Sequence, residues 1–118
     1  MLRYRLSRPA RQDIEAVLEW TEANFGALAR ERYASLILAA LQDLAADPER
    51  PGSRARPELG SDIRSYHLRS SRGRMSRPSE RVQRPRHFVL YRKDGVAALV
   101  IGRILHEAMD AERHVGDW

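Results

Sequence analysis

Two apolar runs near the C-terminal end dominate the hydrophobic pattern of the chain. Residues 87–91 and 96–101 are almost entirely apolar, and they flank Asp94 and Gly95. Such runs around Asp-Gly predict a β-hairpin with a two-residue turn, because a type I′ turn needs positive φ at both central residues. This turn would pair Lys93 with Val96, Leu90 with Leu99, Phe88 with Ile101 and Arg86 with Arg103. Since both runs are apolar on both faces, we expect the hairpin in the middle of a sheet, with material on each side.

The first half of the chain changes from strand-like alternation to helical periodicity. Residues 2–6 alternate apolar and basic side chains, which predicts a half-buried strand. Pro9 suits the first turn of a following helix, and Gly26 is the expected residue after its end. The apolar stripe of this first helix consists of Ala10, Ile14, Val17, Leu18, Thr21 and Phe25.

A second helix is predicted from about Leu28 to Ala46, where Asp47-Pro48 ends it, because the residue before proline disfavours the α region. Its core stripe consists of Tyr33, Leu36, Ile37, Ala40, Leu41 and Leu44. Ala34, Leu38 and Ala45 widen the apolar surface beyond the usual arc. The very short connection between the two helices predicts an αα-hairpin.

The second half is predicted to be irregular up to the hairpin, apart from one strand. Residues 48–62 contain three prolines and two glycines and should form a loop. Residues 63–69 read as a strand, whereas residues 70–85 are rich in Ser, Arg and Pro and should form a mobile insertion. The expected architecture is a single α+β domain over residues 1–118. Its two helices would pack on one face of a four-stranded antiparallel sheet, in the order β-α-α-β-β-β with a short C-terminal helical tail. Asp110 is the expected N-cap of that tail, and Val115 and Trp118 could dock it.

Composition limits the classes of protein that fit this fold. The 118 residues contain no cysteine, which excludes disulfides and thiolate metal sites and permits a reducing cytoplasm. The first residues do not form a signal peptide, and no stretch has the length of a membrane span, so we expect a cytoplasmic protein. The net charge is +5, and residues 50–93 hold 13 basic and 3 acidic groups, a net +10. A segment with this charge favours association with acidic partners, although it also suits a solvated loop.

The residues after the second apolar run carry a resemblance to a known family. Residues 103–106 (Arg-Ile-Leu-His), 109–110 (Met-Asp) and 113–115 (Arg-His-Val) resemble the C-terminal signature of the RelE/ParE superfamily, the toxins of bacterial type II toxin–antitoxin pairs. The ParE branch is the closer match. The resemblance implies a toxin that inhibits DNA gyrase by binding it, without chemistry of its own. It also implies neutralisation by a ParD-like or other small acidic antitoxin, through which the pair could bind operator DNA. The RelE branch implies the alternative, a ribosome-dependent mRNA endonuclease.

Candidate catalytic groups are few. Arg86, Tyr91, Arg103 and His106 could serve an endonuclease as phosphate ligands or as general acid and base, together with His67 and His87. No cluster of Lys, Arg and Tyr resembles the endonuclease active site, so we expect a protein without catalytic activity. The four histidines are not spaced as helical metal ligands, and no glycine-rich phosphate loop is present, so no metal or other cofactor is expected.

Two interaction surfaces follow from the predicted fold and the resemblance. A basic rim formed by Arg81, Arg84, Arg86, Arg103 and His106 is expected to contact the target. Arg103 could instead be a structural partner of Asp110 or of the C-terminal carboxylate. Because ParE-like toxins are wrapped by an antitoxin segment over the helical hairpin, the resemblance also implies an antitoxin surface, which we assign to Val17, Trp20, Ala34 and Leu38. The two helices could instead cover these apolar groups against each other.

Overall fold

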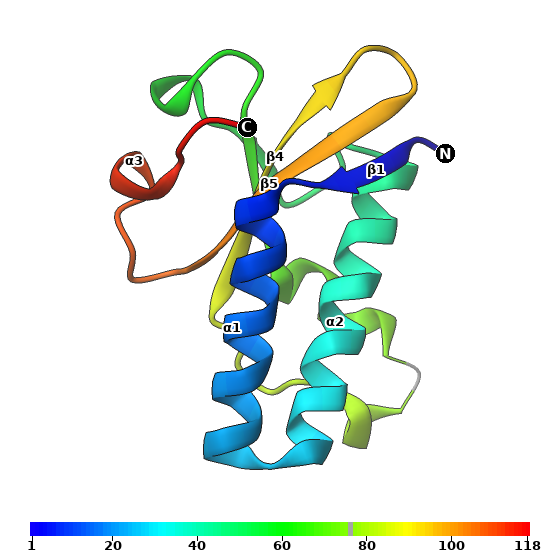
Figure 1. Ribbon diagram of the computed structural model, residues 1–118. Helices are drawn as coiled ribbons and strands as arrows, with labels where there is room; N and C mark the ends of the chain where they lie inside the picture. Colours follow the sequence, from blue (N-terminus) through cyan, green and yellow to red (C-terminus); the bar gives the residue numbers. More distant parts are fainter. Residues whose placement is uncertain (76) are drawn as a thin grey trace.

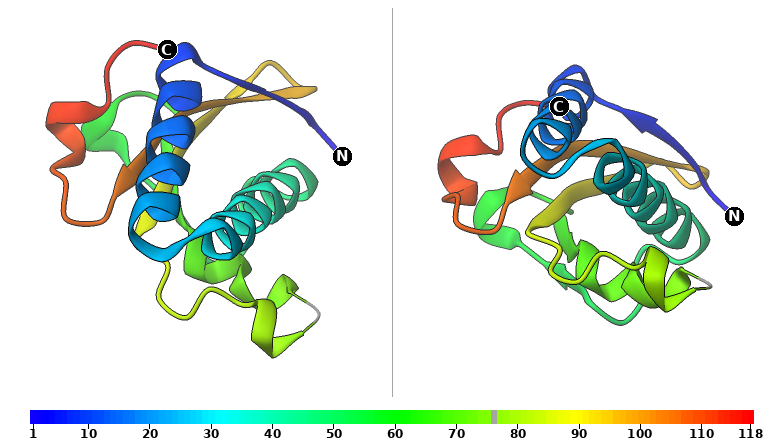
Figure 2. Two further views of the ribbon diagram at one scale, coloured as in Figure 1. Left: turned by 60° about the horizontal axis from the view of Figure 1, so that its bottom comes forward. Right: turned by 90° about the horizontal axis from the view of Figure 1, so that it is seen from below.

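The fold is an α+β sandwich of a helical hairpin and a mixed sheet. The computed structural model describes residues 1–75 and 77–118. Its elements are, in chain order, β1 (Arg3–Leu6), α1 (Arg8–Phe25), α2 (Ala27–Ala46), β2 (Ser53–Ala55), η1 (Pro57–Leu59), β3 (Arg64–His67), η2 (Leu68–Arg74), η3 (Pro78–Glu80), β4 (His87–Asp94), β5 (Ala98–His106) and α3 (Ala111–His114). Figure 1 shows α1 and α2 side by side on one face of the sheet, and the views of Figure 2 show the chain around α3 on the other side.

The two predicted helices are confirmed, together with the residues that begin and end α1. Ser7 caps α1 by accepting a hydrogen bond from the Ala10 N–H at 3.0 Å, while its own hydroxyl donates to the Gly102 carbonyl of β5 at 2.7 Å. Pro9 lies in the first turn. Gly26 has a φ of +94° and joins α1 directly to α2. The start of α1 is therefore fixed to the middle of the sheet.

The sheet differs from the predicted one in size and direction. It has five strands in the order β1-β5-β4-β3-β2, and β1 runs parallel to β5, so the prediction of a four-stranded antiparallel sheet is wrong. The fifth strand, β2, lies in the segment predicted as a loop; its three residues are too few to display an alternating pattern. The αα-hairpin returns the chain to the N-terminus, where the Leu2 N–H donates to the Ala45 carbonyl at 2.8 Å.

The hairpin of β4 and β5 is confirmed, but its predicted register is wrong. Asp94 pairs with Ala98, so the loop holds three residues, and Gly95 alone supplies a positive φ, of +72°. A type I′ turn would need positive φ at two residues, and a three-residue loop is the next common solution. An irregularity between Leu90 and Tyr91 shifts the pairing again. The observed partners replace the predicted ones as follows: Lys93 with Leu99, Leu90 with Arg103, and Phe88 with Leu105.

The hairpin lies in the middle of the sheet and is covered on both faces, as its two-sided apolar pattern predicted. On the face toward the helices, Val89, Tyr91, Leu99, Ile101 and Ile104 of the hairpin form one cluster with Ala10, Tyr66 and all six residues of the predicted α2 stripe. The other face carries a smaller cluster of Leu90, Leu105 and Ala111, onto which Leu59, Ile63, Phe88, Val115 and Trp118 pack. Asp110 caps α3 by accepting from the Glu112 N–H at 3.1 Å. The predicted cap and the predicted docking of the tail are therefore confirmed, whereas Phe25, placed on the α1 stripe, is 68% exposed.

Part of the predicted insertion is attached to the body of the protein. In η2, Ser71 is buried and donates to the Asp43 carboxylate of α2 at 2.6 Å, and Arg74 forms an ion pair with the same group. Val82 packs against the main core. Residue 76 of the segment 70–85 lies outside the described residues. The expected mobility of this segment stays a prediction.

Candidate functional site

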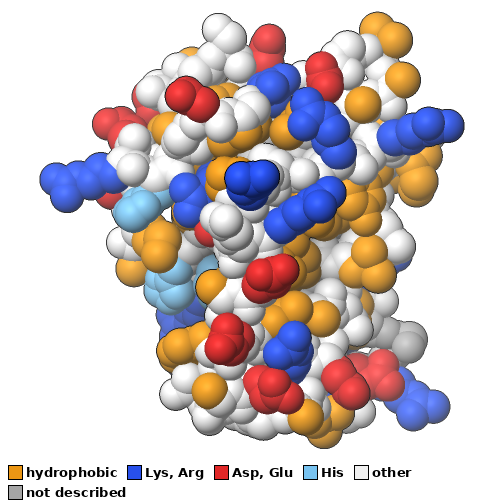
Figure 3. Space-filling view, viewed as in Figure 1, with side chains coloured by type: hydrophobic (Ala, Val, Ile, Leu, Met, Phe, Trp, Pro, Cys, Tyr) orange, Lys and Arg blue, Asp and Glu red, His pale blue; other side chains and the backbone are white. Residues whose placement is uncertain are grey.

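An apolar groove runs between α1 and the segment that leads into β4. It has a volume of about 790 Å³. One wall comes from α1, with Val17 and Trp20, and the opposite wall comes from residues 81–86. His87 at the start of β4 and His106 at the end of β5 also line the groove. The first helix, the basic segment 81–86 and both central strands therefore meet at one surface. Figure 3 shows histidine side chains beside hydrophobic ones at the left edge of the face that carries the helices.

Tyr33 and His87 form the polar centre of this surface. Their side chains are 2.6 Å apart, between the Tyr33 hydroxyl and Nδ1 of His87, and the same hydroxyl accepts the Arg86 N–H at 3.1 Å. The hydroxyl accepts this bond and has its own proton to donate; donation to Nδ1 uses that proton and places the proton of the neutral imidazole on Nε2. This arrangement favours the Nε2-protonated tautomer of His87.

Burial keeps both groups of this pair in their neutral forms at pH 7. It raises the pKa of Tyr33 to about 12. Burial, followed by the charges of His106 and His67, lowers the pKa of His87 to about 4. The rings of His87 and His106 meet edge to face with centroids 5.3 Å apart. Nδ1 of His106 accepts the Ala108 N–H at 3.0 Å, so a neutral His106 ring presents an N–H at Nε2.

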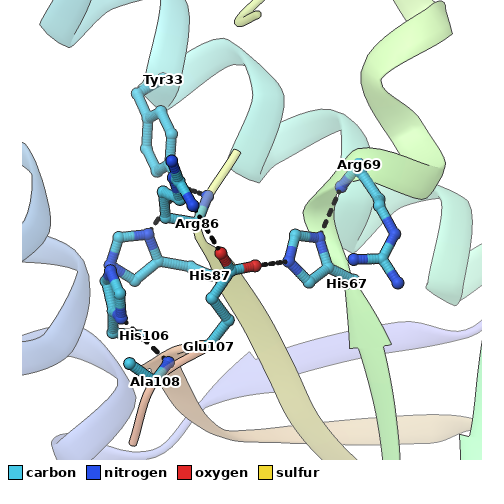
Figure 4. Close-up of polar contacts among 8 residues, drawn as sticks. All are labelled: Tyr33, His67, Arg69, Arg86, His87, His106, Glu107 and Ala108. Atoms are coloured by element: carbon cyan, nitrogen blue, oxygen red, sulfur yellow. Dashed lines mark hydrogen bonds and ion pairs between the residues drawn. The ribbon is translucent and has the colours of Figure 1, made fainter. Parts of the chain in front are cut away.

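Glu107 bridges two strands beside the histidine pair, as Figure 4 shows. Its carboxylate accepts from Nε2 of His67 at 2.8 Å and from Nη1 of Arg86 at 3.0 Å. These hydrogen bonds lower the pKa of Glu107 to about 2, so the group is a carboxylate at physiological pH. The charge of Arg86 is therefore offset by an acid of the same chain.

Arg103 does not belong to this surface. The predicted pairing of Arg86 with Arg103 is wrong, because Arg103 lies opposite Leu90, whereas the Arg86 carbonyl accepts the Glu107 N–H at 2.8 Å. Arg103 forms an ion pair with Asp13 of α1 at 2.7 Å, and this hydrogen-bonded pair raises the pKa of the guanidinium. The structural alternative for Arg103 fits this geometry, with Asp13 in place of the acids considered from the sequence.

Tyr91 is also remote from the groove. Its ring is buried in the main core, and its hydroxyl contacts the Pro48 carbonyl and the Ser53 hydroxyl beyond the far edge of the helical layer. Burial raises the pKa of this phenol. Of the four catalytic candidates, Arg86 and His106 therefore line the groove, and Tyr91 and Arg103 do not.

The residues assigned to antitoxin binding are divided by the structure. Val17 and Trp20 line the groove, and Trp20 is 59% exposed. Ala34 and Leu38 of α2 are not among the lining residues, although Leu38 is exposed. Arg81 and Arg84 also line the groove, and their role in target binding stays a prediction.

Some residues of the site were not identified from the sequence. Tyr33 was assigned only to the core stripe, Asp13 only to the favourable N-terminal end of the first helix, and Glu107 received no role. Their partners lie 21 to 90 positions away along the chain, and no local pattern marks such contacts. Within residues 1–75 and 77–118, no group of three or more His, Asp or Glu side chains is placed to hold a metal ion. No helix in that part of the chain is long and apolar enough to cross a membrane.

Comparison with known proteins identifies the family. The family model described as "ParE toxin of type II toxin-antitoxin system, parDE" matches residues 4–111, from β1 to the first residue of α3. No curated protein matches the chain.

Proposed function

Because the chain belongs to the ParE toxin family of type II toxin–antitoxin systems, we propose that it inhibits DNA gyrase by binding it and is neutralised by a cognate antitoxin. The inhibitor acts in the cytoplasm, where its target is found. The antitoxin is a small acidic protein of the ParD type, and operator DNA is bound through that partner. The chain itself needs no metal or other cofactor for this role.

The pairing of Arg86 and of Arg103, the two arginines predicted as phosphate ligands, with acidic side chains is the observation that carries a binding role over a catalytic one. Cleavage of a phosphodiester requires cations that are available to the scissile phosphate. Arg86 is held by Glu107 at 3.0 Å, and Arg103 is held by Asp13 at 2.7 Å. Tyr91 is buried in the core. The groups that the sequence offered to an endonuclease are therefore largely committed to contacts within the fold.

The target surface of this proposal is the rim formed by Arg81, Arg84, Arg86 and His106. These side chains line one opening of the groove, and they suit an acidic protein surface or DNA held by a topoisomerase. Arg103 no longer contributes to that rim. The antitoxin occupies the adjacent apolar part around Val17 and Trp20, so that it covers the target surface. Leu38 and Ala34 would contact an antitoxin segment only where it extends over the outer side of α2.

A second function, ribosome-dependent mRNA cleavage, is favoured by a different observation. His67, His87 and His106 lie in one network with Tyr33 and Glu107 (Figure 4). Histidine is the most common general acid or base in enzymes, and such catalysis contributes roughly 10²–10⁴-fold to a rate. His106 is the group that could exchange a proton with a ligand, because Nδ1 of His87 is occupied by Tyr33.

The variant His106→Gln separates the two functions. Glutamine retains a hydrogen-bonding group of similar reach but cannot transfer a proton near neutral pH. We expect His106→Gln to retain most of the inhibition of gyrase in a supercoiling assay, and neither protein to cleave mRNA on purified ribosomes. Cleavage by the wild-type protein that disappears in His106→Gln would establish the endonuclease instead.

A further inference from the structure

The charged side chains that line the groove are all basic. Sixteen described residues line it, and they include four arginines and two histidines but no aspartate or glutamate. The arginines are Arg32, Arg81, Arg84 and Arg86. Because the chain carries a net charge of only +5, this arrangement concentrates positive charge at one surface. A ligand that enters the groove therefore meets several cations and no competing anion on its walls.

The two walls differ in chemistry. The α1 wall is apolar: Trp20 and Phe25 pack edge to face with centroids 5.7 Å apart, and they are 59% and 68% exposed. Exposed aromatic pairs of this kind mark surfaces that bind a partner. The opposite wall, residues 81–86, alternates arginine with Val82 and Gln83. An occupant must therefore be apolar on one side and acidic on the other.

The basic wall is held in place by contacts at both of its ends. Val82 packs against the main core, and the Arg86 N–H donates to the Tyr33 hydroxyl at 3.1 Å. Nε of Arg81 donates to the Met75 carbonyl at 3.3 Å. These contacts hold the two ends of the wall against the body of the protein, and Arg81, Arg84 and Arg86 all line the groove. Because its two ends are anchored, the wall loses less conformational freedom on binding than a free loop would.

Most of the groove arginines have no acidic partner within the described part of the chain. Arg86 is paired with Glu107, but no ion pair involves Arg32, Arg81 or Arg84. Nε of Arg32 is buried without a hydrogen-bond partner. A buried donor of this kind gains from an acceptor that approaches it. Three cations are therefore available to carboxylates of a bound molecule.

We propose that residues 81–86 select the antitoxin, by pairing Arg81 and Arg84 with acidic side chains of an amphipathic antitoxin segment whose apolar face lies on Val17, Trp20 and Phe25. This inference rests on the proposed toxin–antitoxin function and specifies the chemistry of its partner. We commit to a polypeptide and not a nucleic acid, because the α1 wall is mainly apolar and the arginines of the groove are Arg32 and those of residues 81–86, an arrangement that suits an amphipathic segment. The geometry is that of helix-in-groove recognition, in which apolar anchors give affinity and flanking charges give selectivity.

The test compares charge reversal on the wall with charge reversal elsewhere. The probe is the cognate antitoxin of the proposed pair, sought among small acidic proteins encoded beside this chain and titrated by calorimetry against the purified toxin. The double variant Arg81→Glu/Arg84→Glu changes the wall, and Arg11→Glu/Arg54→Glu makes the same charge change at exposed positions outside the groove. Circular dichroism and thermal melting verify that each variant is folded.

We expect the wall variant to bind the antitoxin roughly tenfold more weakly or worse, and the control variant to bind within about twofold of the wild type. The wild-type affinity should fall with added salt, and the wall variant should lose most of that dependence. Equal affinities of the two double variants would overturn this inference and leave the toxin–antitoxin pair intact. No binding to the wild-type toxin would overturn the proposed function and this inference with it. A single-stranded RNA that displaces the antitoxin from the wild type but not from the wall variant would identify the wall as a nucleic-acid site instead.

Discussion

Arg103 of β5 and Asp13 of α1 form a bidentate ion pair, with 2.7 Å between Nε and Oδ2 and 2.9 Å between Nη2 and Oδ1. The same carboxylate accepts the Ile104 N–H at 2.9 Å. Arg103 also donates to the His114 carbonyl of α3. One guanidinium therefore joins the first helix, the last long strand and the C-terminal helix.

Replacing Arg103 by alanine should destabilise the whole fold. The two side chains are 21% and 15% exposed, so removal of the arginine leaves a poorly solvated carboxylate. We expect the free energy of unfolding to fall by about 2–4 kcal/mol in urea denaturation. Arg113→Ala is the matched control: its side chain is 83% exposed and pairs with Asp110 only at 3.6 Å, so its effect should stay below about 0.5 kcal/mol. If the Arg103→Ala protein is stable and binds antitoxin but no longer inhibits growth, Arg103 contacts the target and its role is not structural.

His87 should make stability depend on pH. Its pKa is lowered to about 4 in the folded protein, against an ordinary value of 6.5. Between these values the unfolded chain binds a proton more readily than the folded one, so the stability contributed by the neutral ring is lost as the pH falls from 6.5 toward 4. His87→Asn offers an acceptor to the Tyr33 hydroxyl but does not titrate. Urea denaturation at several pH values in this window should therefore show a smaller loss of stability for the variant. A wild-type curve parallel to that of the variant would contradict the assignment.

Asp43 should hold η2 against α2. Its buried carboxylate forms ion pairs with Arg50, at 2.8 Å from Nη1, and with Arg74. It also accepts a hydrogen bond from the Ser71 hydroxyl at 2.6 Å. Asp43→Ala should lower the free energy of unfolding by about 3 kcal/mol, because two cations and a buried hydroxyl lose their acceptor. It should also speed amide exchange at residues 71–74. Glu49→Gln, in an exposed pair with Arg64 at 3.7 Å, is the control.

The expected mobility of the segment 70–85 is tested by the same exchange measurement on the wild-type protein. The Asp43 contacts predict slower exchange at residues 71–74 than at residues 77–84, which have fewer partners in the fold. Uniformly slow exchange over both parts would contradict the prediction that the Arg-rich segment is mobile.

Gly102 should be required for the docking of the C-terminus. A Cβ added at Gly102 would lie 2.0 Å from the Trp118 ring, so a side chain at this position displaces the indole. Gly102→Ala should detach the tail and shift the Trp118 fluorescence to the red, measured in a Trp20→Phe background. The destabilisation should be much smaller when Trp118 has already been replaced by alanine, because the clash is then absent. Additive effects of the two substitutions would contradict this contact.

Most features that depend on interactions between residues close in sequence were predicted correctly, and most features that depend on distant contacts were not. Both helices were predicted because their signals are local. The apolar stripes repeat within helices of 18 and 20 residues, and Pro9 and Gly26 mark the two ends of the first helix. The two-sided apolar pattern of β4 and β5 correctly indicated cover on both faces. The turn between them was predicted one residue too short, because Asp-Gly also fits a loop in which only Gly95 adopts positive φ.

The parts that could not be predicted depend on contacts distant in sequence. The parallel pairing of β1 with β5 joins Arg3 to Ala98, and no pattern within a four-residue strand encodes its direction. The groove depends on the same kind of contact, since Tyr33 meets His87 across 54 positions. The sequence did indicate that Arg81, Arg84, Arg86 and His106 lie together, because they flank the two ends of one hairpin. It placed Arg103 with them only through the mistaken register.

Inhibition of gyrase by the purified toxin is the most direct test of the proposed function. DNA supercoiling by purified gyrase is measured against increasing toxin, with and without an equimolar amount of the antitoxin from the adjacent reading frame. We predict that the toxin stops supercoiling, that the antitoxin restores it, and that Arg81→Glu/Arg84→Glu inhibits less than Arg11→Glu/Arg54→Glu. Unchanged supercoiling at a large excess of folded toxin, together with cleavage of ribosome-bound mRNA, would contradict the account.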